Sequence, residues 1–456
     1  MNVYLLLVTC YLLLFLFLAI KNLKTALFLT IFSLPAYQIR FNLGPLPMTV
    51  LEVNILLVFL VWLIKSFKHF NILTFKQNLR ENLFLYFCIF IFLLSATISM
   101  FISPDLRAAA GLWKVYFLEP ILFLIVFVSI IKQKDLDKVF KWLGASAILL
   151  SLFAIYQKIS GAFISNPFWA AESTRRVTSV FPYPNALALF LTPILIILIG
   201  LFVQKYKNAS PRRYQVLFFA TFLLTTSLFG ILAIYFTKSK GALLALLAGI
   251  IFYTLFYKGH RKIFTTILII TIITFITIIT INPAFIKGTA SVEGGDSIST
   301  RLEMWSEAWQ MLKTKPLLGA GLAGYQTAVV SFHTKDYIEV YLYPHNIFLN
   351  FWTEIGLLGL LAFIGIIIWF YKTGFFCHPV LDTGSRGQKN VLDPGFRRDD
   401  KMVVLMSAMT ALLVHGLVDV PYFKNDLAIL FWLLISLMII SRRGGRAAEG
   451  ATLEKS

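Results

Sequence analysis

The chain has 456 residues, of which 58% are hydrophobic and only 14% are charged, and its mean hydropathy is +0.79. A soluble protein of this length needs a larger polar fraction to cover its surface, so a wholly soluble fold is excluded. The formal net charge of +19 does not indicate nucleic-acid binding, because the Lys and Arg residues form short clusters between apolar runs.

Long apolar runs recur along the whole chain. They are about 17–22 residues long, which suits membrane-spanning helices, whereas the strands of a barrel need only about 9–11 residues. We therefore predict an all-α, polytopic transmembrane helical bundle of 12 or 13 spans, because the second run is short and contains Pro35. The candidate spans are 3–20, 24–39, 48–64, 82–102, 115–131, 139–159, 185–203, 214–236, 240–257, 262–281, 345–371, 402–420 and 424–441.

Basic clusters set the predicted orientation. Alternate loops between the spans hold most of the 41 Lys and Arg residues, and the positive-inside rule places these loops in the cytoplasm. The first span lacks a cationic lead and a small-residue cleavage site, so we expect a retained helix. The resulting divisions are N-terminal transmembrane helices at 1–281, an extracytoplasmic loop at 282–344, C-terminal transmembrane helices at 345–441 and a cytoplasmic tail at 442–456.

One cytoplasmic segment differs from its surroundings. Residues 377–401 are polar and rich in Gly and Asp, which predicts a mobile insertion within the loop 372–401. The stretch is similar to translated short genomic repeats that insert into bacterial reading frames. We do not expect it to take part in any reaction.

The long loop 282–344 contains a predicted helix near 300–314. Thr300 and Glu303 form a capping-box pattern, and an apolar face follows at helical spacing, made by Leu302, Trp305, Trp309 and Leu312. This face suits packing on the bundle or on the membrane surface, and a direct substrate role for the tryptophans is the alternative. Pro316 ends the helix.

A glycine-rich stretch follows at residues 319–324, and its pattern is formally G-x-G-x-x-G. No strand precedes it and no βαβ unit surrounds it, so it does not indicate a dinucleotide site. The glycines instead predict a tight turn or a close approach of the backbone to a ligand.

The end of the long loop carries the most specific motif. His345-Asn346 precedes Gly356 and Gly359 in the pattern H-N-x9-G-x-x-G, at the start of a predicted span. With this pattern, the chain resembles the O-antigen ligase and polymerase family of bacterial envelope enzymes, and the motif is typical of the ligase side.

Further elements support the resemblance, which covers roughly residues 170–440. Arg301, Trp305 and the stretch Pro316–Gly321 resemble the family pattern R-x3-W…P-L-x-G-x-G. Three more elements are similar to family patterns: Arg176 to Val180 with Pro184-Asn185, where Val replaces the usual Leu; Ser239-Lys240-Gly241, where Lys replaces Arg; and His415 with Asp419 as H-x3-D.

The resemblance implies an enzyme of defined class. It implies a metal-independent glycosyltransferase that moves a glycan from an undecaprenyl-diphosphate carrier to an acceptor hydroxyl on a lipid A–core sugar or another surface glycan. The expected location is the bacterial inner membrane, with the active site on the extracytoplasmic face. The expected partners are the glycan donor, the glycan or glycolipid acceptor and the lipid bilayer, with no cofactor and no nucleic acid.

Other functions remain as alternatives. A polymerase of the same family would join repeat units to each other, and transfer to a protein is a further variant. A transporter of lipid-linked glycans belongs to a different class, but it should show inverted repeats and ionisable groups at mid-membrane. We find no convincing internal repeat, and the notable charges fall at one predicted face.

The residue types suit the implied chemistry. Arginines such as Arg176 and Arg301 match phosphate oxygens and stay charged, and His345 can serve as the general base for an acceptor hydroxyl. Salt-bridge or lipid-headgroup anchoring of the arginines, and a structural histidine, are the alternatives. Additional candidates for substrate binding are Lys240, Arg175, Asn346, His415 and Asp419.

Two of these candidates have a simpler reading. His415 and Asp419 lie four residues apart on one predicted helix face, and a purely structural pairing with each other is the alternative. No cluster outside the predicted spans has the spacing of metal ligands, and no metal site is predicted.

Overall fold

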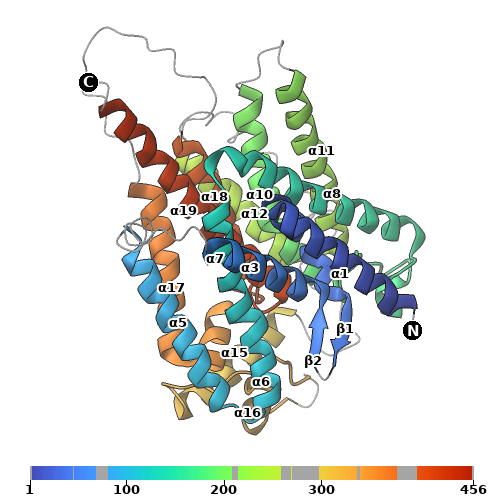
Figure 1. Cartoon of the computed structure of the whole chain (residues 1–456). Coiled ribbons are helices and arrows are strands. Elements are labelled where there is room, and N and C mark those ends of the chain that lie inside the picture. The colour runs from blue at the N-terminus through green and yellow to red at the C-terminus, as the bar shows by residue number, and fades with distance from the viewer. Residues whose placement is uncertain are drawn as a thin grey trace.

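Helices account for nearly all of the structure (Figure 1), which confirms the predicted all-α bundle. The computed structural model describes residues 3–67 apart from Pro45, then 81–207, 214–257, 297–335, 339–376 and 398–453, together with residues 266 and 269. Within these residues, eight helices are long and apolar enough to cross a membrane: Val3–Lys21, Leu83–Phe101, Leu106–Ile130, Gln133–Ser160, Pro184–Gln204, Leu217–Thr237, Ile347–Phe376 and Asn425–Arg443. The chain is therefore a multi-pass membrane protein.

The elements follow one another along the chain with short connections. The first half contains α1 (Val3–Lys21), α2 (Leu23–Phe32), the 3-10 helix η1 (Leu34–Gln38), β1 (Arg40–Leu43), β2 (Leu46–Thr49), α3 (Val50–Phe67), α5 (Leu83–Phe101), α6 (Leu106–Trp113), the π-helical turn η2 (Lys114–Leu118), α7 (Glu119–Ile130), η3 (Gln133–Asp135), α8 (Leu136–Ser160) and α9 (Pro167–Ala170). The second half contains α10 (Pro184–Lys207), α11 (Tyr214–Thr237), α12 (Lys240–Phe256), α15 (Ser297–Thr314), α16 (Tyr325–Val329), η4 (Val330–Phe332), α17 (Ile347–Phe376), α18 (Arg398–His415) and α19 (Asn425–Leu453).

Some predicted boundaries differ from the observed ones. The predicted span 24–39 is a ten-residue helix, α2, followed by a 3-10 helix, because Pro35 cannot continue an α-helix. The span predicted at 402–420 ends at His415. The span predicted at 262–281 and most of the predicted insertion at 377–401 lie outside the described residues.

A short β-hairpin also interrupts the helices. Strands β1 and β2 pair antiparallel, with Arg40 opposite Thr49 and Leu43 opposite Leu46. Gly44 has a φ of +61°, a conformation that glycine adopts without steric cost. The hairpin was not predicted, because four-residue strands are too short to show a clear alternation.

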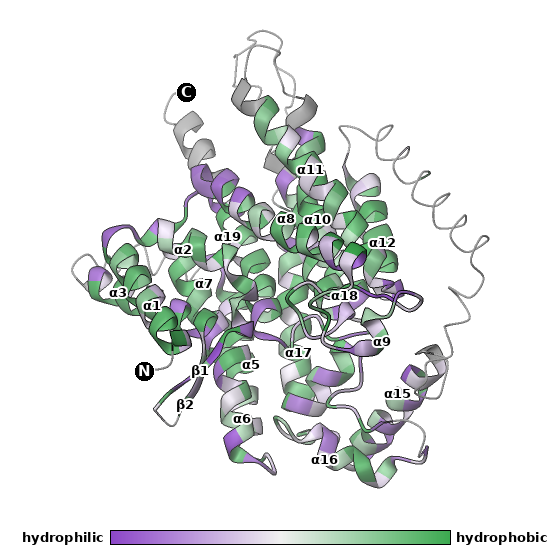
Figure 2. Cartoon of the chain, turned by 90° about the vertical axis from the view of Figure 1, so that its right-hand side faces the viewer, coloured by the Kyte–Doolittle hydropathy of each residue, from purple (hydrophilic) through white to green (hydrophobic). Residues whose placement is uncertain are grey.

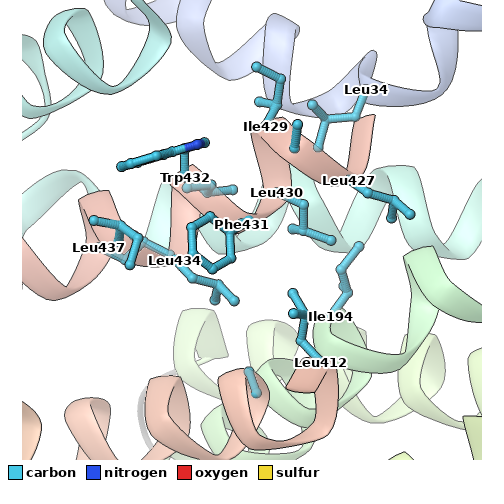
Figure 3. Packing of buried hydrophobic residues seen from close by; sticks show 14 of the residues in the cluster. Leu34, Ile194, Leu412, Leu427, Ile429, Leu430, Phe431, Trp432, Leu434 and Leu437 are labelled. Carbon is cyan, nitrogen blue, oxygen red and sulfur yellow. The ribbon is translucent and has the colours of Figure 1, made fainter. Parts of the chain in front are cut away.

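Helices α10 and α19 form the centre of the bundle. Almost the whole apolar part of each helix is buried, and α10 contacts α11, α12 and α18. Figure 3 shows Leu430, Phe431 and Leu434 of α19 packed in this core, with Ile194 of α10 and Leu412 of α18 close by. These packed helices provide a rigid base for the loops at their ends.

The described part of the loop 282–344 is a folded cap rather than an extended linker. Helices α15 and α16 lie at one end of the molecule, opposite the C-terminus (Figure 1), and carry more polar residues than the bundle helices (Figure 2). A small core joins them to each other and to α17: Ala308, Met311, Leu312, Ala320, Tyr325 and Val329, with Leu349 and Trp352 packed against it.

Helix α15 confirms the predicted helix near 300–314, but not all of its details. It begins at Ser297, so Thr300 lies within the helix, and Glu303 accepts a hydrogen bond from Thr334 instead of capping. The predicted apolar face packs on the protein only in part, because Leu302 and Trp309 are exposed and Leu312 is buried. The buried apolar stripe is made by Met304, Ala308, Met311 and Leu312. The predicted face centred on the tryptophans instead, because their side chains are larger.

The two glycine motifs dock on each other through the main chain. Gly356 has φ +73° and ψ 177°, which breaks α17, and a Cβ there would lie 2.4 Å from the Leu317 carbonyl oxygen. A Cβ on Gly319 would lie 2.4 Å from the Thr353 carbonyl oxygen. Three hydrogen bonds join the turn to the broken helix: Leu357 N to Leu317 O at 2.9 Å, Ala320 N to Thr353 O at 2.7 Å, and Trp352 Nε1 to Pro316 O at 2.7 Å.

This docking predicts a strict requirement for glycine at position 356. Gly356→Ala should destabilise the protein by about 1–3 kcal/mol from backbone strain, with an additional cost from the clash with Leu317. We expect a melting temperature several degrees lower for the purified variant in detergent. Gly111→Ala is the matched control, since a Cβ at Gly111 meets no atom within 4 Å. Equal melting temperatures for the two variants would contradict the docking.

Candidate active site

The sequence-predicted residues converge where several helices end. Arg176 lies in the loop before α10, Arg301 on α15 and His345 immediately before α17. Asp419 lies in the loop 416–424 between α18 and α19, and Lys240 is the first residue of α12. This end of the bundle is the one predicted to face the extracytoplasmic side.

His345 pairs with a buried carboxylate. Its Nδ1 lies 3.3 Å from Oδ1 of Asp419, whose side chain is 3% exposed, whereas the imidazole is 20% exposed. When Nδ1 donates to Asp419, Nε2 is the ring nitrogen that can accept a proton. The backbone of His345 has a φ of +47°, an uncommon conformation for a residue with a side chain, and such strain concentrates at functional sites.

His415 and Asp419 do not share a helix face as predicted, although the two residues still interact electrostatically. Helix α18 ends at His415, and Gly416 turns the chain so closely against α17 that a Cβ there would meet Ile347 at 2.7 Å. Burial alone would raise the pKa of Asp419. The hydrogen bond from His345 and the charges of His345 and His415 outweigh it and hold that pKa below the usual carboxyl range. Asp419 is therefore an anion at neutral pH.

Arg176 and Arg301 lie close to each other. Burial, and then the nearby charge of Arg301, lower the pKa of Arg176 to about 10, so it stays protonated at neutral pH. Its guanidinium donates to neutral acceptors, the Thr237 carbonyl at 2.8 Å and Asn185 Oδ1 at 3.1 Å. Arg301 Nε donates to the Val418 carbonyl at 2.8 Å, one residue before Asp419. This bond ties α15 to the loop that carries the carboxylate.

A third cation was missed by the sequence analysis. Lys238, in the turn between α11 and α12, has a φ of +55°, and burial followed by the charges of Lys158 and Arg176 lowers its pKa. Lys240 is half-buried, and Ser239 caps its helix through Ala242 N. The T-K-S-K-G sequence at 237–241 held the signal, because both of its lysines lie at the predicted extracytoplasmic turn.

Two other predicted residues have local structural contacts. Arg175 caps the carboxyl end of α8, where it donates to the carbonyls of Lys158 and Ile159, and it also donates to the carbonyl of Ala170 at the end of α9. Asn346 caps the start of α17, since its Oδ1 accepts from Phe348 N and Leu349 N. Its Nδ2 also donates to the Leu417 carbonyl at 3.2 Å, which fixes the position of the neighbouring His345.

Two tyrosines connect His345 to a buried lysine. The Tyr343 ring lies 5.0 Å from the His345 ring, and its hydroxyl lies 3.2 Å from the Tyr183 hydroxyl. Burial, followed by the Asp419 charge, raises the pKa of Tyr343 to about 12, so it stays neutral. The ammonium of Lys424 lies 3.7 Å from the centre of the Tyr183 ring. Sequence reasoning missed Lys424, because a lysine at the start of a span usually marks the membrane interface.

Residues 225–364 match the O-antigen ligase family model. The predicted resemblance is confirmed over this segment, which contains Lys238, Arg301 and His345, whereas Arg176 and Asp419 lie outside it. The comparison with curated proteins finds no match. The O-antigen ligase match supports a glycosyltransferase of the ligase or polymerase kind in general.

The contacts of Arg175 predict a stability effect without a large loss of activity. Arg175→Ala removes hydrogen bonds from a charged donor to helix-end carbonyls, which should cost about 1–3 kcal/mol of stability. We expect a lower melting temperature in detergent, with glycan transfer by the folded protein reduced less than threefold. A loss of transfer at an unchanged melting temperature would instead assign Arg175 to the substrate site.

Proposed function

We propose that this protein transfers a glycan from an undecaprenyl-diphosphate carrier to an acceptor hydroxyl at the outer face of the inner membrane. The observation that carries the proposal is the His345–Asp419 pair, placed in the same site as Arg176 and Arg301. A base and a pair of permanent cations are the two components that such a transfer needs.

His345 is the proposed general base. Its Nε2 takes the proton of the acceptor hydroxyl while the hydroxyl oxygen forms a bond to the anomeric carbon of the donor sugar. Asp419 holds the imidazole in the tautomer that leaves Nε2 basic, and its charge stabilises the imidazolium that forms. The positions of Asn346 and Ile347 support this orientation, because both hydrogen-bond to the loop that carries Asp419.

Arg176 and Arg301 are the proposed ligands of the leaving group. The bond between the anomeric carbon and the phosphate oxygen breaks, and the electron pair leaves with the undecaprenyl diphosphate. The developing charge is stabilised by guanidinium groups that stay protonated and match phosphate oxygens in geometry. Lys238 adds a third positive charge beside Arg176. These cations would supply the charge stabilisation for which other enzymes use a divalent ion, so we propose a metal-independent reaction.

The acceptor separates a ligase from a polymerase. A ligase would transfer the glycan to a lipid A–core sugar or another surface glycan, and a polymerase would transfer it to a second carrier-linked repeat unit. The same base and cations serve both reactions. The ligase motif H-N-x9-G-x-x-G favours the first, and both acceptors belong in the test.

Removal of the base or of either arginine should abolish most of the transfer. Purified protein in detergent is given an undecaprenyl-diphosphate-linked repeat unit and either lipid A–core or a second repeat unit as acceptor. We expect His345→Ala, Arg176→Ala and Arg301→Ala each to reduce the rate by roughly 10²-fold or more. A chelator should leave the wild-type rate unchanged.

Arg107→Ala is the matched control for the arginines, because Arg107 is exposed on α6. Its rate should equal that of wild type. Full activity in the three site variants would refute the mechanism, and loss of activity on chelation would refute metal independence.

Asp419 should affect turnover rather than binding. Asp419→Asn removes the charge beside His345 while keeping the size of the side chain, so kcat should fall by roughly 10²–10⁴-fold. The KM for donor and for acceptor should change little, because Asp419 contacts the imidazole rather than the substrate. Steady-state kinetics with both substrates varied would measure this, and a raised KM at unchanged kcat would contradict the proposed role.

A further inference from the structure

Lys424 is a buried cation that the mechanism above does not use. Its side chain is at the end of the loop 416–424 and the residue is only 9% exposed. Among the described residues, no hydrogen-bond acceptor contacts its ammonium nitrogen. An ammonium has three N–H donors, and burial without acceptors is costly, so this position calls for a partner that supplies oxygen atoms.

The surroundings of Lys424 lead directly to His345. The ammonium lies 3.7 Å from the centre of the Tyr183 ring, whose hydroxyl lies 3.2 Å from that of Tyr343. The Tyr343 ring in turn contacts the His345 ring. Tyr183 and Tyr343 are both half-buried, so they combine an apolar ring with a hydroxyl that can donate or accept.

The charges near Lys424 favour a neutral ligand over an anion. Two carboxyl groups, Asp426 and Asp419, act on its ammonium, and Asp426 is fully buried in the first turn of α19. The negative charge of Asp419 would repel a phosphate bound there. The environment of Arg176 is the opposite, because the charges acting on it come from other cations. A neutral ligand with many hydroxyl groups fits Lys424, and a diphosphate fits the arginines.

We propose that Lys424, Tyr183 and Tyr343 form a sugar-binding subsite that holds the acceptor beside His345. This inference rests on the proposed glycan transfer and adds the position of the second substrate. Displacement at the anomeric carbon requires the acceptor to enter opposite the leaving group. Arg301 on one side and Lys424 on the other both lie near the His345–Asp419 pair. In this arrangement the base lies between the diphosphate and the acceptor sugar.

The first test measures which substrate loses affinity. Lys424→Met keeps the length of the side chain and removes its N–H donors. In the transfer assay with lipid A–core as acceptor, we expect the acceptor KM to rise at least tenfold and the donor KM to stay within twofold. Lys313→Met is the matched control, because Lys313 is an exposed lysine at the same end of the molecule, and both of its KM values should equal those of wild type.

Each result decides the question. A raised donor KM would place Lys424 in the diphosphate site and overturn the inference, and two unchanged KM values would do the same by reducing Lys424 to a structural residue. If the wild-type protein itself shows no transfer with any acceptor, the proposed function fails rather than the subsite.

A binding measurement keeps the inference testable if Lys424→Met does not fold. In a His345→Ala background without turnover, soluble core oligosaccharide is titrated into the protein by calorimetry. Tyr183→Phe and Tyr343→Phe remove one hydroxyl each and keep the ring. We expect each to weaken oligosaccharide binding at least threefold, with an unchanged melting temperature. Unchanged oligosaccharide affinity in both variants would overturn the subsite.

Discussion

The site depends on one junction between the start of α17 and the end of α18. The amide of Ile347 donates to the Gly416 carbonyl at 2.7 Å, and Asn346 donates to the Leu417 carbonyl. Asp419, two residues after Leu417, pairs with His345. The carbonyl of Val418, which lies between Leu417 and Asp419, accepts a hydrogen bond from Arg301. Four consecutive loop residues thus position the imidazole, its carboxylate and one guanidinium relative to each other. The buried helices α10 and α19 beneath the loop keep that arrangement rigid.

The cap completes the junction from the other side. The turn at Leu317 to Ala320 hydrogen-bonds the main chain at the Gly356 break, and Glu354 accepts a hydrogen bond from Ala323 N at 2.7 Å. These bonds fix the cap, and with it α15 and Arg301, to the first turns of α17. The glycines were predicted to form a tight turn or to let the backbone approach a ligand; Gly319 and Gly321 adopt positive φ, and Gly319 lets two main-chain segments approach each other.

Much of this architecture could be predicted from the sequence, because apolar runs of membrane length specify helices wherever they occur. The motifs also located Arg176, Arg301 and His345 before their proximity was known. The failures have physical causes. Asp419 was placed on a helix because the turn at Gly416 depends on contact with Ile347, far away in the chain. Lys238 and Lys424 escaped notice because a lysine near a helix end usually reaches water, as Lys238 does. Only the fold shows that Lys238 lies near Arg176 and that Lys424 is buried near Asp419.

The distribution of the site along the chain limits how the protein can be divided. The segment that matches the ligase family model, 225–364, includes one guanidinium and the imidazole, but the other guanidinium precedes it and the carboxylate follows it. A fragment trimmed to this segment would carry His345 without its Asp419 partner and Arg301 without Arg176. Chimeras that exchange this region between related chains therefore need to include the preceding loop and the last two helices along with the matched region.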